Sequence, residues 1–478
     1  MTLIQSQPES PAPAAAPAPA ADPVRVRHIA RGVPVDGEAR AFGSGEHRFV
    51  TPELDLDALV WTRGEPGPAF DTPIAEIIDL LVELRGWIER DPEGLVAEAL
   101  AASLRTNPLP DAVLRDAFGS LGNSFRREAM EFMIEHEFGG ADVLDGWRAV
   151  PDAPSGRTVR VRAFPARIVH VLAGNAPGVA ALSVLRGALT KGVNLFKLPS
   201  NDLHSAGVLL SGLHAIAPDH PTTRSFSAAY WRGGDAAVES VLFQPQFFDK
   251  LVAWGGESAL RSAKNHVGPG FELVSFDPKS SVSLVGREAF ASEETLQEAA
   301  DAAARDITLM DQQACAASRF QFVEGDTRDA DRFAEALLPR LGVRRRMGSA
   351  AGNPVPENIR VEVEALRDLE PYARVFGEYG GHGLVVRSED PVDFFPEGKV
   401  ANVVPVAGLD DALARINIAT QSVGVYPASR KAALRDRLAA AGAARICTLG
   451  DVPIVESGLP HDGFYPMPRL VRWVTDEG

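Results

Sequence analysis

Cys315 is the residue around which we expect the chemistry of this chain to be organised. It stands in the segment Asp311-Gln-Gln-Ala-Cys-Ala-Ala-Ser-Arg319, which is rich in small side chains, and it is one of two cysteines in 478 residues. A thiolate is a strong nucleophile, and backbone N–H groups beside it can hold the oxyanion of a tetrahedral adduct. A lone cysteine is more often a buried structural side chain, so the surrounding pattern has to decide between the two interpretations.

The elements before Cys315 are those that would position it. Ser281-Val-Ser-Leu-Val-Gly286 has the composition of a strand, and apolar residues then recur every three or four positions from Leu296 to Met310, as in a helix. A cysteine just after such a helix, among small neighbours, can stand exposed in a cleft. This context favours a nucleophile.

The composition excludes several classes of protein. Hydrophobic residues make up 45% and charged residues 23% of the chain, as in ordinary globular proteins, and its length suffices for two or three domains. The net charge of −16 argues against a nucleic-acid partner. The N-terminus lacks the features of a secretory signal, and the most apolar run, 168–196, is broken by prolines and charges, so no membrane span is expected. Two cysteines are too few for a disulfide framework, which predicts a cytoplasmic location.

Alternating strand and helix patterns predict a mostly parallel sheet. The strand pattern of 167–172 is followed by a loop, a helical pattern over 179–190 and a second strand pattern at 193–198. A similar alternation resumes after Cys315, from Phe320 to Tyr426. Ligands of such sheets bind at the carboxyl ends of the strands. A standard dinucleotide fingerprint, GxGxxG, is absent. No metal site is expected either, since His136 has no second histidine at helical spacing.

Taken in order, these stretches resemble the aldehyde dehydrogenase superfamily over roughly residues 140–478. The likeness is greatest to its acyl-CoA reductase branch, typified by the LuxC-type fatty acid reductases of bacterial bioluminescence, which share the ending Pro460-His-Asp-Gly463 with Leu470-Val-Arg-Trp-Val474. The resemblance implies an α/β fold with two parallel-sheet domains, for cofactor and catalysis, and a β-hairpin oligomerisation arm. The expected division is a disordered Pro/Ala tail (1–24), a helical part of the cofactor domain (25–141), the hairpin arm (142–168), the nucleotide-binding domain (169–285), the catalytic domain (286–458) and a C-terminal strand (459–478).

The resemblance also implies a role for Asn175 beside Cys315. Gly174-Asn-Ala-Pro177 stands where the family has its Asn-Phe-Pro loop, and Gln313-Ala-Cys315 matches the family's Gly-Gln-x-Cys. By this likeness the Asn175 amide donates to the oxyanion together with the Cys315 backbone N–H. The plainer interpretation of Asn175 is a loop cap.

Five residues are implied as cofactor contacts. Phe196-Lys-Leu-Pro-Ser200 matches the family's Lys-Pro-Ser/Ala-Glu, so Lys197 would bind the adenosine ribose or its phosphate, and Ser200 replaces the acidic residue that binds the ribose. Without that carboxylate a 2′-phosphate meets no repulsion, which favours NADPH over NADH. Arg232 could add a second cation, or be an ordinary surface arginine. Gly255 and Gly256 stand at the family's cofactor turn, and Glu397 stands near its nicotinamide-ribose glutamate.

The position of the family's hydrolytic glutamate is occupied by Ser275. A serine without a partner is no base near neutral pH, so water should release an acyl-enzyme slowly. Glu272 is the local alternative base. The expected reaction is therefore NADPH-dependent reduction of an acyl thioester to the aldehyde, with Cys315 acylated and CoA or a carrier thiol as leaving group. A hydrolytic aldehyde dehydrogenase and a non-redox acyl-transfer subunit remain open.

Partners follow from the same resemblance. The acyl donor would be an acyl-CoA or an acyl carrier, and an acyl-activating ligase is the partner that would supply it. The 142–168 hairpin and the terminal strand predict a homo-oligomer. The basic run Arg344-Arg-Arg346 is either a solvated loop or a phosphate contact.

Overall fold

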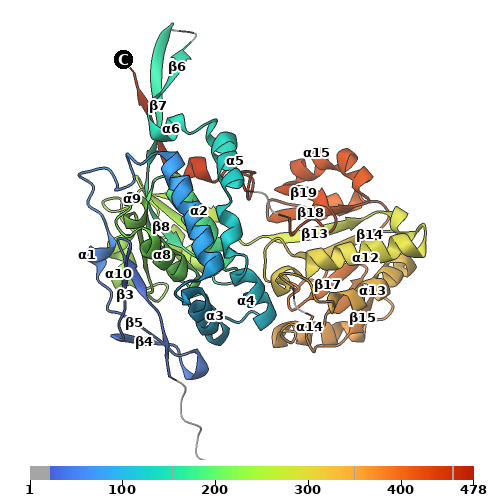
Figure 1. Cartoon of the computed structure of the whole chain (residues 1–478). Helices are drawn as coiled ribbons and strands as arrows, with labels where there is room; N and C mark the ends of the chain where they lie inside the picture. The colour runs from blue at the N-terminus through green and yellow to red at the C-terminus, as the bar shows by residue number, and fades with distance from the viewer. Residues whose placement is uncertain (1–21, 153, 155, 349, 455–456, 478) are drawn as a thin grey trace, which may run out of the picture.

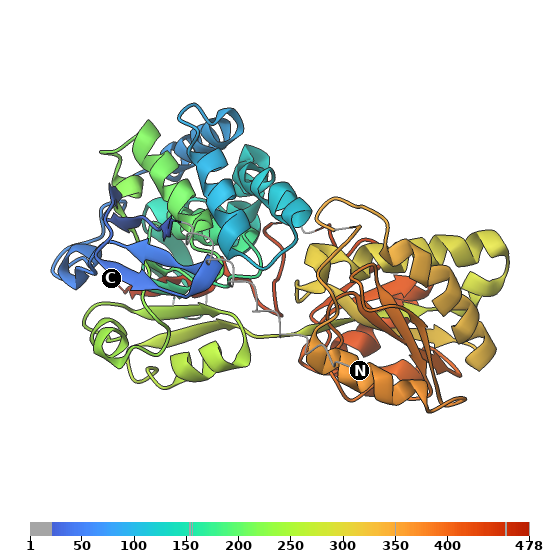
Figure 2. The same ribbon diagram turned by 90° about the horizontal axis from the view of Figure 1, so that it is seen from below.

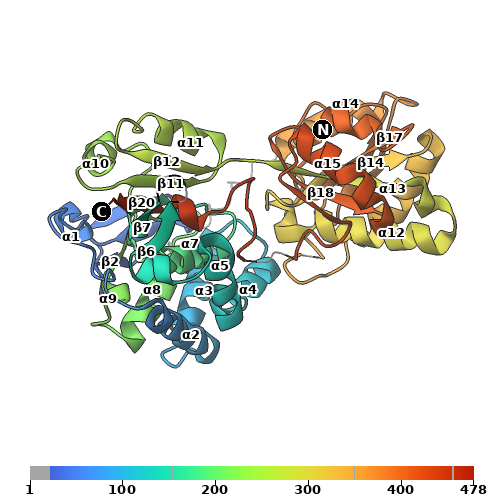
Figure 3. The ribbon, with the colours of Figure 1, turned by 90° about the horizontal axis from the view of Figure 1, so that it is seen from above.

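The computed structural model describes residues 22–477, apart from residues 153, 155, 349 and 455–456. Two lobes lie side by side, each built on a seven-stranded sheet (Figure 1). We call them the N-terminal and the C-terminal lobe. In Figures 2 and 3 the chain crosses between them in a pale green segment and again in a red one. The tail predicted over residues 1–24 lies almost entirely outside the described residues.

The first sheet is mostly parallel, as the alternating pattern predicts. Its order is β12-β11-β8-β9-β10-β2-β3, with the first five strands parallel and β2 and β3 antiparallel at one edge. The strands are β2 (His28–Ala30), β3 (Val33–Val35), β8 (Arg167–Val171), β9 (Val193–Lys197), β10 (Phe226–Ala229), β11 (Lys250–Trp254) and β12 (Glu272–Phe276). The central strands are almost continuously buried, because helices cover both faces.

Helices α2, α7 and α8 pack on one face of this sheet, and α10 and α11 pack on the other. The apolar residues of α2 recur every three or four positions and turn one side of the helix into the core. The helices of this lobe are α1 (Leu56–Leu59), α2 (Ile74–Arg90), α3 (Leu95–Thr106), α4 (Asp111–Phe118), α5 (Arg127–Phe138), α6 (Asp142–Asp145), α7 (Gly178–Leu189), α8 (Ser205–Ile216), α9 (Pro221–Arg224), α10 (Ala236–Leu242) and α11 (Glu257–Lys264).

The first part of the predicted helical region, 25–141, differs from the prediction. Strands β1 (Val24–Arg25), β5 (Phe49–Thr51) and β4 (Arg40–Phe42) form a small sheet in that order, and β2 and β3 extend the first sheet. Each of these strands has two or three residues, which is too short for an alternating pattern to be recognised. The predicted helices begin at α2.

The second sheet has the order β15-β16-β17-β14-β13-β18-β19, parallel except for β15. Its strands are β13 (Ser280–Val285), β14 (Ser318–Glu324), β15 (Ala373–Gly377), β16 (Leu384–Ser388), β17 (Val400–Val406), β18 (Thr420–Tyr426) and β19 (Arg445–Thr448). Helices α12 (Glu293–Ile307) and α13 (Thr327–Leu341) cover one face, α15 (Lys431–Ala441) covers the other, and α14 (Glu357–Arg367) packs beside β16 and β17. Because β13 belongs to this sheet, the chain changes lobes before residue 280 and not at 285 as predicted.

A third sheet projects from the N-terminal lobe (Figure 1). It joins β6 (Arg148–Asp152), β7 (Arg157–Pro165) and β20 (Val471–Asp476) in the order β20-β7-β6. The antiparallel β6–β7 pairing is the hairpin expected within 142–168, and β20 is the expected terminal strand. Because β20 pairs with β7, the segment after β19 has to return from the C-terminal lobe to the N-terminal lobe. None of the described helices is both long enough and apolar enough to cross a membrane.

Candidate active site

Cys315 lies in a tight turn between α12 and β14. Met310, Asp311 and Gln312 all have positive φ angles, of 53°, 54° and 66°, in a region that side chains rarely occupy. Three such residues in succession cost conformational energy, which the surrounding structure has to offset. The turn places Cys315 at the amino end of the second sheet, facing the N-terminal lobe.

Hydrogen bonds hold this turn in place. The Ser281 Oγ donates to the Cys315 carbonyl oxygen at 3.0 Å, and the same Oγ accepts from the Ser422 N–H at 3.1 Å. The buried Gln312 amide donates to the Val400 carbonyl at 2.8 Å, and Arg319 donates to the Gln312 carbonyl at 2.7 Å. The turn is therefore anchored to the amino ends of several neighbouring strands.

The Cys315 thiol is a free cysteine exposed to solvent, yet protein atoms surround its sulfur closely. Burial raises the pKa of the thiol, and the Asp462 carboxylate raises it further. Hydrogen bonds to the sulfur from the Gln421 amide and from the backbone N–H groups of Ala316 and Cys315 act in the opposite direction. These donors stabilise negative charge at the sulfur, as the chemistry of a nucleophile requires.

Asn175 lies at this turn, as the resemblance implies. It stands in the loop after β8, and its Nδ2 donates to the Gln313 carbonyl oxygen at 2.9 Å, two residues before Cys315. The loop is held in turn by Asn107, whose amide donates to the Gly174 carbonyl oxygen. The structure thus brings Asn175 and Cys315 together from the two lobes.

A third segment, the turn 461–464 near the C-terminus, also lies beside Cys315. The turn 461–464 is closed by two backbone hydrogen bonds between His461 and Phe464, and Asp462 has a positive φ of 54°. The Gln421 Nε2 lies 3.2 Å from the His461 Nε2 and 3.2 Å from the Asp462 Oδ1. Because Gln421 also acts to lower the pKa of the Cys315 thiol and Asp462 acts to raise it, these four side chains form one cluster.

Aromatic side chains of the first sheet pack against this turn. Trp254 and Phe276, at the carboxyl ends of β11 and β12, stack at 3.6 Å, and the His461 ring lies 5.5 Å and 5.2 Å from them. The Arg186 guanidinium lies over both rings, and burial lowers its pKa to about 10. Burial, with the cations Arg186, Lys279 and Arg445, lowers the pKa of His461 to about 3, so the imidazole is neutral.

Lys197, at the end of β9, borders a cavity of about 290 Å³ that is also lined by residues of α10 and α11. Its ammonium lies 6.0 Å and 5.7 Å from the rings of Tyr230 and Trp231, and among the described residues no hydrogen bond or ion pair engages it. Burial lowers the pKa of Lys197, opposed by the Glu239 charge. A buried cation beside an open cavity is suited to an anionic ligand group.

The other predicted cofactor residues differ in their placement. Gly255, with a φ of 146°, and Gly256, where a Cβ would meet nothing within 4 Å, precede α11, whose N-cap has no side-chain hydrogen bond. The first N–H groups of α11 are thus open to an acceptor. Ser200 is exposed and is not among the residues lining the Lys197 cavity. Burial lowers the pKa of Arg319 to about 10, and the charge of the nearby Glu397 opposes this shift.

The structure also shows the surroundings of Glu272 and Ser275, the two positions considered for a hydrolytic base. Glu272, at the beginning of β12, is held by Lys250 at 2.5 Å and by Arg469 at 2.6 Å. Burial raises its pKa, but these two hydrogen bonds outweigh burial and lower the pKa overall. Ser275 lines a separate cavity of about 700 Å³ that also reaches Asp462. Glu272 is therefore an ion-paired carboxylate and not a free base.

The remaining sequence candidates are ordinary structural contacts. In the run 344–346, Arg344 pairs with Asp116, Arg345 with Asp301, and Arg346 with the Ser120 hydroxyl. Arg232 is exposed. The run therefore has protein partners for each of its guanidinium groups.

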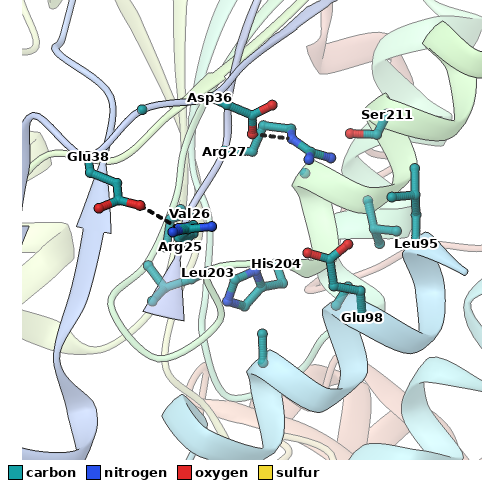
Figure 4. Close-up of a pocket in the computed structure, with 15 residues that line it drawn as sticks. Arg25, Val26, Arg27, Asp36, Glu38, Leu95, Glu98, Leu203, His204 and Ser211 are labelled. Carbon is teal, nitrogen blue, oxygen red and sulfur yellow. Dashed lines mark hydrogen bonds and ion pairs between the residues drawn. The ribbon is translucent and has the colours of Figure 1, made fainter. Parts of the chain in front are cut away.

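Another cavity, of about 460 Å³, lies between β1, α3 and α8, away from Cys315 (Figure 4). Figure 4 shows its ion pairs, Arg25 with Glu38 and Arg27 with Asp36, and His204 directed toward it. Its lining contains no cysteine, so the thiol chemistry of a thioester belongs to the Cys315 cluster.

The residues that sequence reasoning did not single out are Gln421, His461 and Asp462. The string Pro460-His-Asp-Gly463 was the available signal, since it matched the ending of one family branch. Gln421, inside a strand pattern, carried no signal of its own.

Comparison with known proteins places the chain in a family. Residues 71–473 match the family described as acyl-CoA reductase (LuxC). The long-chain acyl-protein thioester reductase of Photorhabdus luminescens is 30% identical over 349 residues, which cover 72% of this chain and 70% of that protein. The enzyme of the same name from Vibrio harveyi is 29% identical over 355 residues, covering 73% and 71%.

Solved structures show the fold. Aldehyde dehydrogenase 21 of Physcomitrella patens, in complex with succinate, superposes with a TM-score of 0.72 over 95% of this chain and 98% of that one, at 14% identity. The NAD⁺ complex of an aldehyde dehydrogenase from Bacillus cereus superposes with a TM-score of 0.68 over 94% of this chain and 96% of that one, at 16% identity. The chain has the aldehyde dehydrogenase fold, and it belongs to the LuxC family of acyl-CoA reductases, which are aldehyde-forming oxidoreductases.

Proposed function

We propose that this protein reduces a long-chain acyl thioester to the aldehyde, with NADPH as reductant and with an acyl-Cys315 intermediate. The observation that carries the proposal is the exposed Cys315 thiol, held in a strained turn between Asn175 and the Gln421 amide. Family membership and the names of the relatives support the substrate class.

In the first half of the reaction the Cys315 sulfur attacks the thioester carbonyl. The Asn175 amide and the backbone N–H groups beside Cys315 stabilise the oxyanion, since fixed neutral donors need little reorganisation as charge develops. The C–S bond of the donor then breaks, the donor thiol leaves, and the acyl group remains on Cys315. The donor is CoA or a thiol carried by a protein.

In the second half the acyl group leaves Cys315 as aldehyde. A bound nicotinamide cofactor supplies the hydride for this step. Lys197 would hold the 2′-phosphate or ribose, Gly255 and Gly256 would admit the pyrophosphate to the start of α11, and Glu397 would hold the nicotinamide ribose. The unengaged Lys197 ammonium supports NADPH, as does the serine at position 200, where the family has an acidic residue.

Hydrolysis of the acyl-enzyme is disfavoured by the surroundings of the site. Ser275 takes the place of a basic carboxylate, and Glu272 is engaged by Lys250 and Arg469. The acyl group would therefore persist on Cys315 until reduction.

We further propose a cytoplasmic homo-oligomer that uses the β6–β7 hairpin and β20 as its arm, served by an acyl-activating ligase. The sheet β20-β7-β6 projects from the lobe, and among the described strands β6 lies at its edge, which suits pairing with a second copy. Both cysteines are free thiols, in keeping with a reducing compartment.

The test is mass spectrometry of the protein after incubation with a long-chain acyl-CoA, first without and then with NADPH. We expect an acyl adduct on Cys315 that persists alone and is discharged as aldehyde when NADPH is added. A Cys447→Ala variant should behave in the same way, because Cys447 is buried. An adduct that NADPH does not discharge would replace the reductase by an acyl-transfer subunit, and discharge as free acid would indicate hydrolysis.

A further inference from the structure

The loop 461–464 brings a buried carboxylate to the nucleophile. Asp462 lies in a turn, where side chains usually point to solvent, yet only 6% of its side chain is exposed. Packing of the neighbouring His461 ring against Trp254 and Phe276 fixes the loop against the N-terminal lobe. The Asp462 carboxylate is therefore aimed inward by the fold, toward the Cys315 sulfur whose pKa it raises.

Gln421 connects this carboxylate to the turn that carries Cys315. Its Nε2 donates to the Asp462 Oδ1 at 3.2 Å, and the N–H of the next residue, Ser422, donates to the Ser281 Oγ, which in turn holds the Cys315 carbonyl oxygen. Its Oε1 is buried and has no hydrogen-bond partner among the described residues. A buried amide that holds the Asp462 carboxylate beside the Cys315 turn and leaves its own acceptor unsatisfied has a positioning function.

We propose that Asp462 is the proton acceptor and donor of the acylation step, with Gln421 as the residue that positions it against Cys315. This rests on the proposed acyl-Cys315 function. As the sulfur attacks, the Cys315 S–H bond breaks, its electron pair forms the S–C bond, and the proton moves to the Asp462 carboxylate. When the C–S bond of the donor breaks, Asp462 returns that proton to the departing thiolate, so the carboxylate is regenerated and no electrons are gained or lost.

The groups around Asp462 suit this role. Burial raises the pKa of Asp462 to about 6, opposed by Lys279, the Gln421 hydrogen bond and Arg186, and reinforced by Asp277. A carboxyl group with such a pKa can both accept and donate a proton near neutral pH. The neighbouring His461, with a pKa of about 3, is too weak a base to compete and accepts the Gln421 hydrogen bond instead.

The test uses two reactions of Cys315 in the full-length protein. Single-turnover acylation by a long-chain acyl-CoA needs the proton to be moved, whereas alkylation by iodoacetamide needs only the thiolate. The variants are Asp462→Asn, the conservative Asp462→Glu, and the control Asp277→Asn, whose carboxylate also faces Asp462 but is exposed.

We expect Asp462→Asn to slow acylation at pH 7 by at least about 100-fold and to abolish an inflection near pH 6 in the wild-type rate. Alkylation should become faster at the same pH, because removal of the negative charge lowers the pKa of Cys315. Asp462→Glu should recover part of the acylation rate, and Asp277→Asn should follow the wild type.

Parallel loss of acylation and alkylation in Asp462→Asn would indicate a structural role and overturn the proposal, as would unchanged acylation. If the wild-type protein takes up no acyl group, the proposed function fails. The pH dependence of alkylation then still decides whether Asp462 is coupled to the Cys315 thiol. A thiol pKa lowered in Asp462→Asn but not in Asp277→Asn supports the coupling of Asp462 to Cys315, and equal thiol pKa values overturn it.

Discussion

The Oγ of Ser281, at the amino end of β13, donates a hydrogen bond to the carbonyl oxygen of Cys315 at 3.0 Å. This bond connects the strand that enters the C-terminal lobe to the turn that carries Cys315. Because the turn contains three residues with positive φ, its conformation depends on such external contacts.

Replacement of Ser281 by alanine should therefore slow acylation of Cys315. Loss of one hydrogen bond of about 1 kcal/mol predicts a decrease of roughly fivefold in the acylation rate, measured by mass spectrometry over time. Ser283 is the matched control, since it is buried two residues along the same strand and bonds to Ser318. An equal decrease in Ser283→Ala would show that the effect comes from the strand and not from the contact with Cys315.

The buried pair of Lys399 and Asp311 should be important for stability. The Lys399 Nζ lies 3.7 Å from the Asp311 Oδ1, and both side chains are almost completely buried. Lys399→Met leaves the Asp311 carboxylate buried without its cation, which should lower the free energy of unfolding by about 3 kcal/mol in urea denaturation. The double variant Lys399→Met/Asp311→Asn should recover part of this loss. A double variant as unstable as the sum of the two single variants would contradict the coupling.

The place of Cys315 in a turn after a helix and the strand–helix alternation could be predicted from the sequence because their signals are local. Cys315 follows a periodic helix within a few residues, and the loop with Asn175 follows the strand β8 directly. The strand at 280–285 was recognised, but its assignment to the second sheet depends on pairing with β14 and β18, which local patterns do not encode. The strands before α2 could not be predicted, because two or three residues are too few to show an alternating pattern.

The cluster of Gln421 and Asp462 could not be predicted for a different reason. These residues meet because β20 pairs with β7, far earlier in the chain, and so brings the turn 461–464 back toward the N-terminal lobe. Ser200, whose position in a matched motif implies a cofactor contact, is exposed in the turn after β9. Its proposed place beside the ribose stays a prediction.

Lys197→Ala should weaken binding of NADPH much more than it changes acylation. A buried ammonium that meets a phosphate group contributes about 1.5–3 kcal/mol, so the KM for NADPH should rise at least about tenfold. Acylation of Cys315 by acyl-CoA, measured without cofactor, should stay near the wild-type rate. Arg232→Ala, which removes an exposed cation of the next loop, is the comparison and should have a smaller effect. An unchanged KM in Lys197→Ala would remove this residue from the cofactor site.

Glu137 should make the stability of the protein depend on pH. Its Oε2 accepts a hydrogen bond from the Met467 N–H at 2.8 Å, and burial raises its pKa from 4.5 to about 7, opposed by that bond and by Arg186. Between these two values the folded protein binds a proton that the unfolded chain releases, so the free energy of unfolding falls as the pH rises. The contribution between pH 4.5 and pH 7 is on the order of 2–3 kcal/mol.

In Glu137→Gln this titration is absent, so the thermal midpoint should change less between pH 5 and pH 8 than in the wild type. Glu135→Gln is the control, because Glu135 is exposed on the same helix, and it should keep the wild-type dependence. If Glu137→Gln retains the full dependence, the proton is bound elsewhere, and Asp306, whose pKa is raised to about 7 mainly by burial, is the next group to replace.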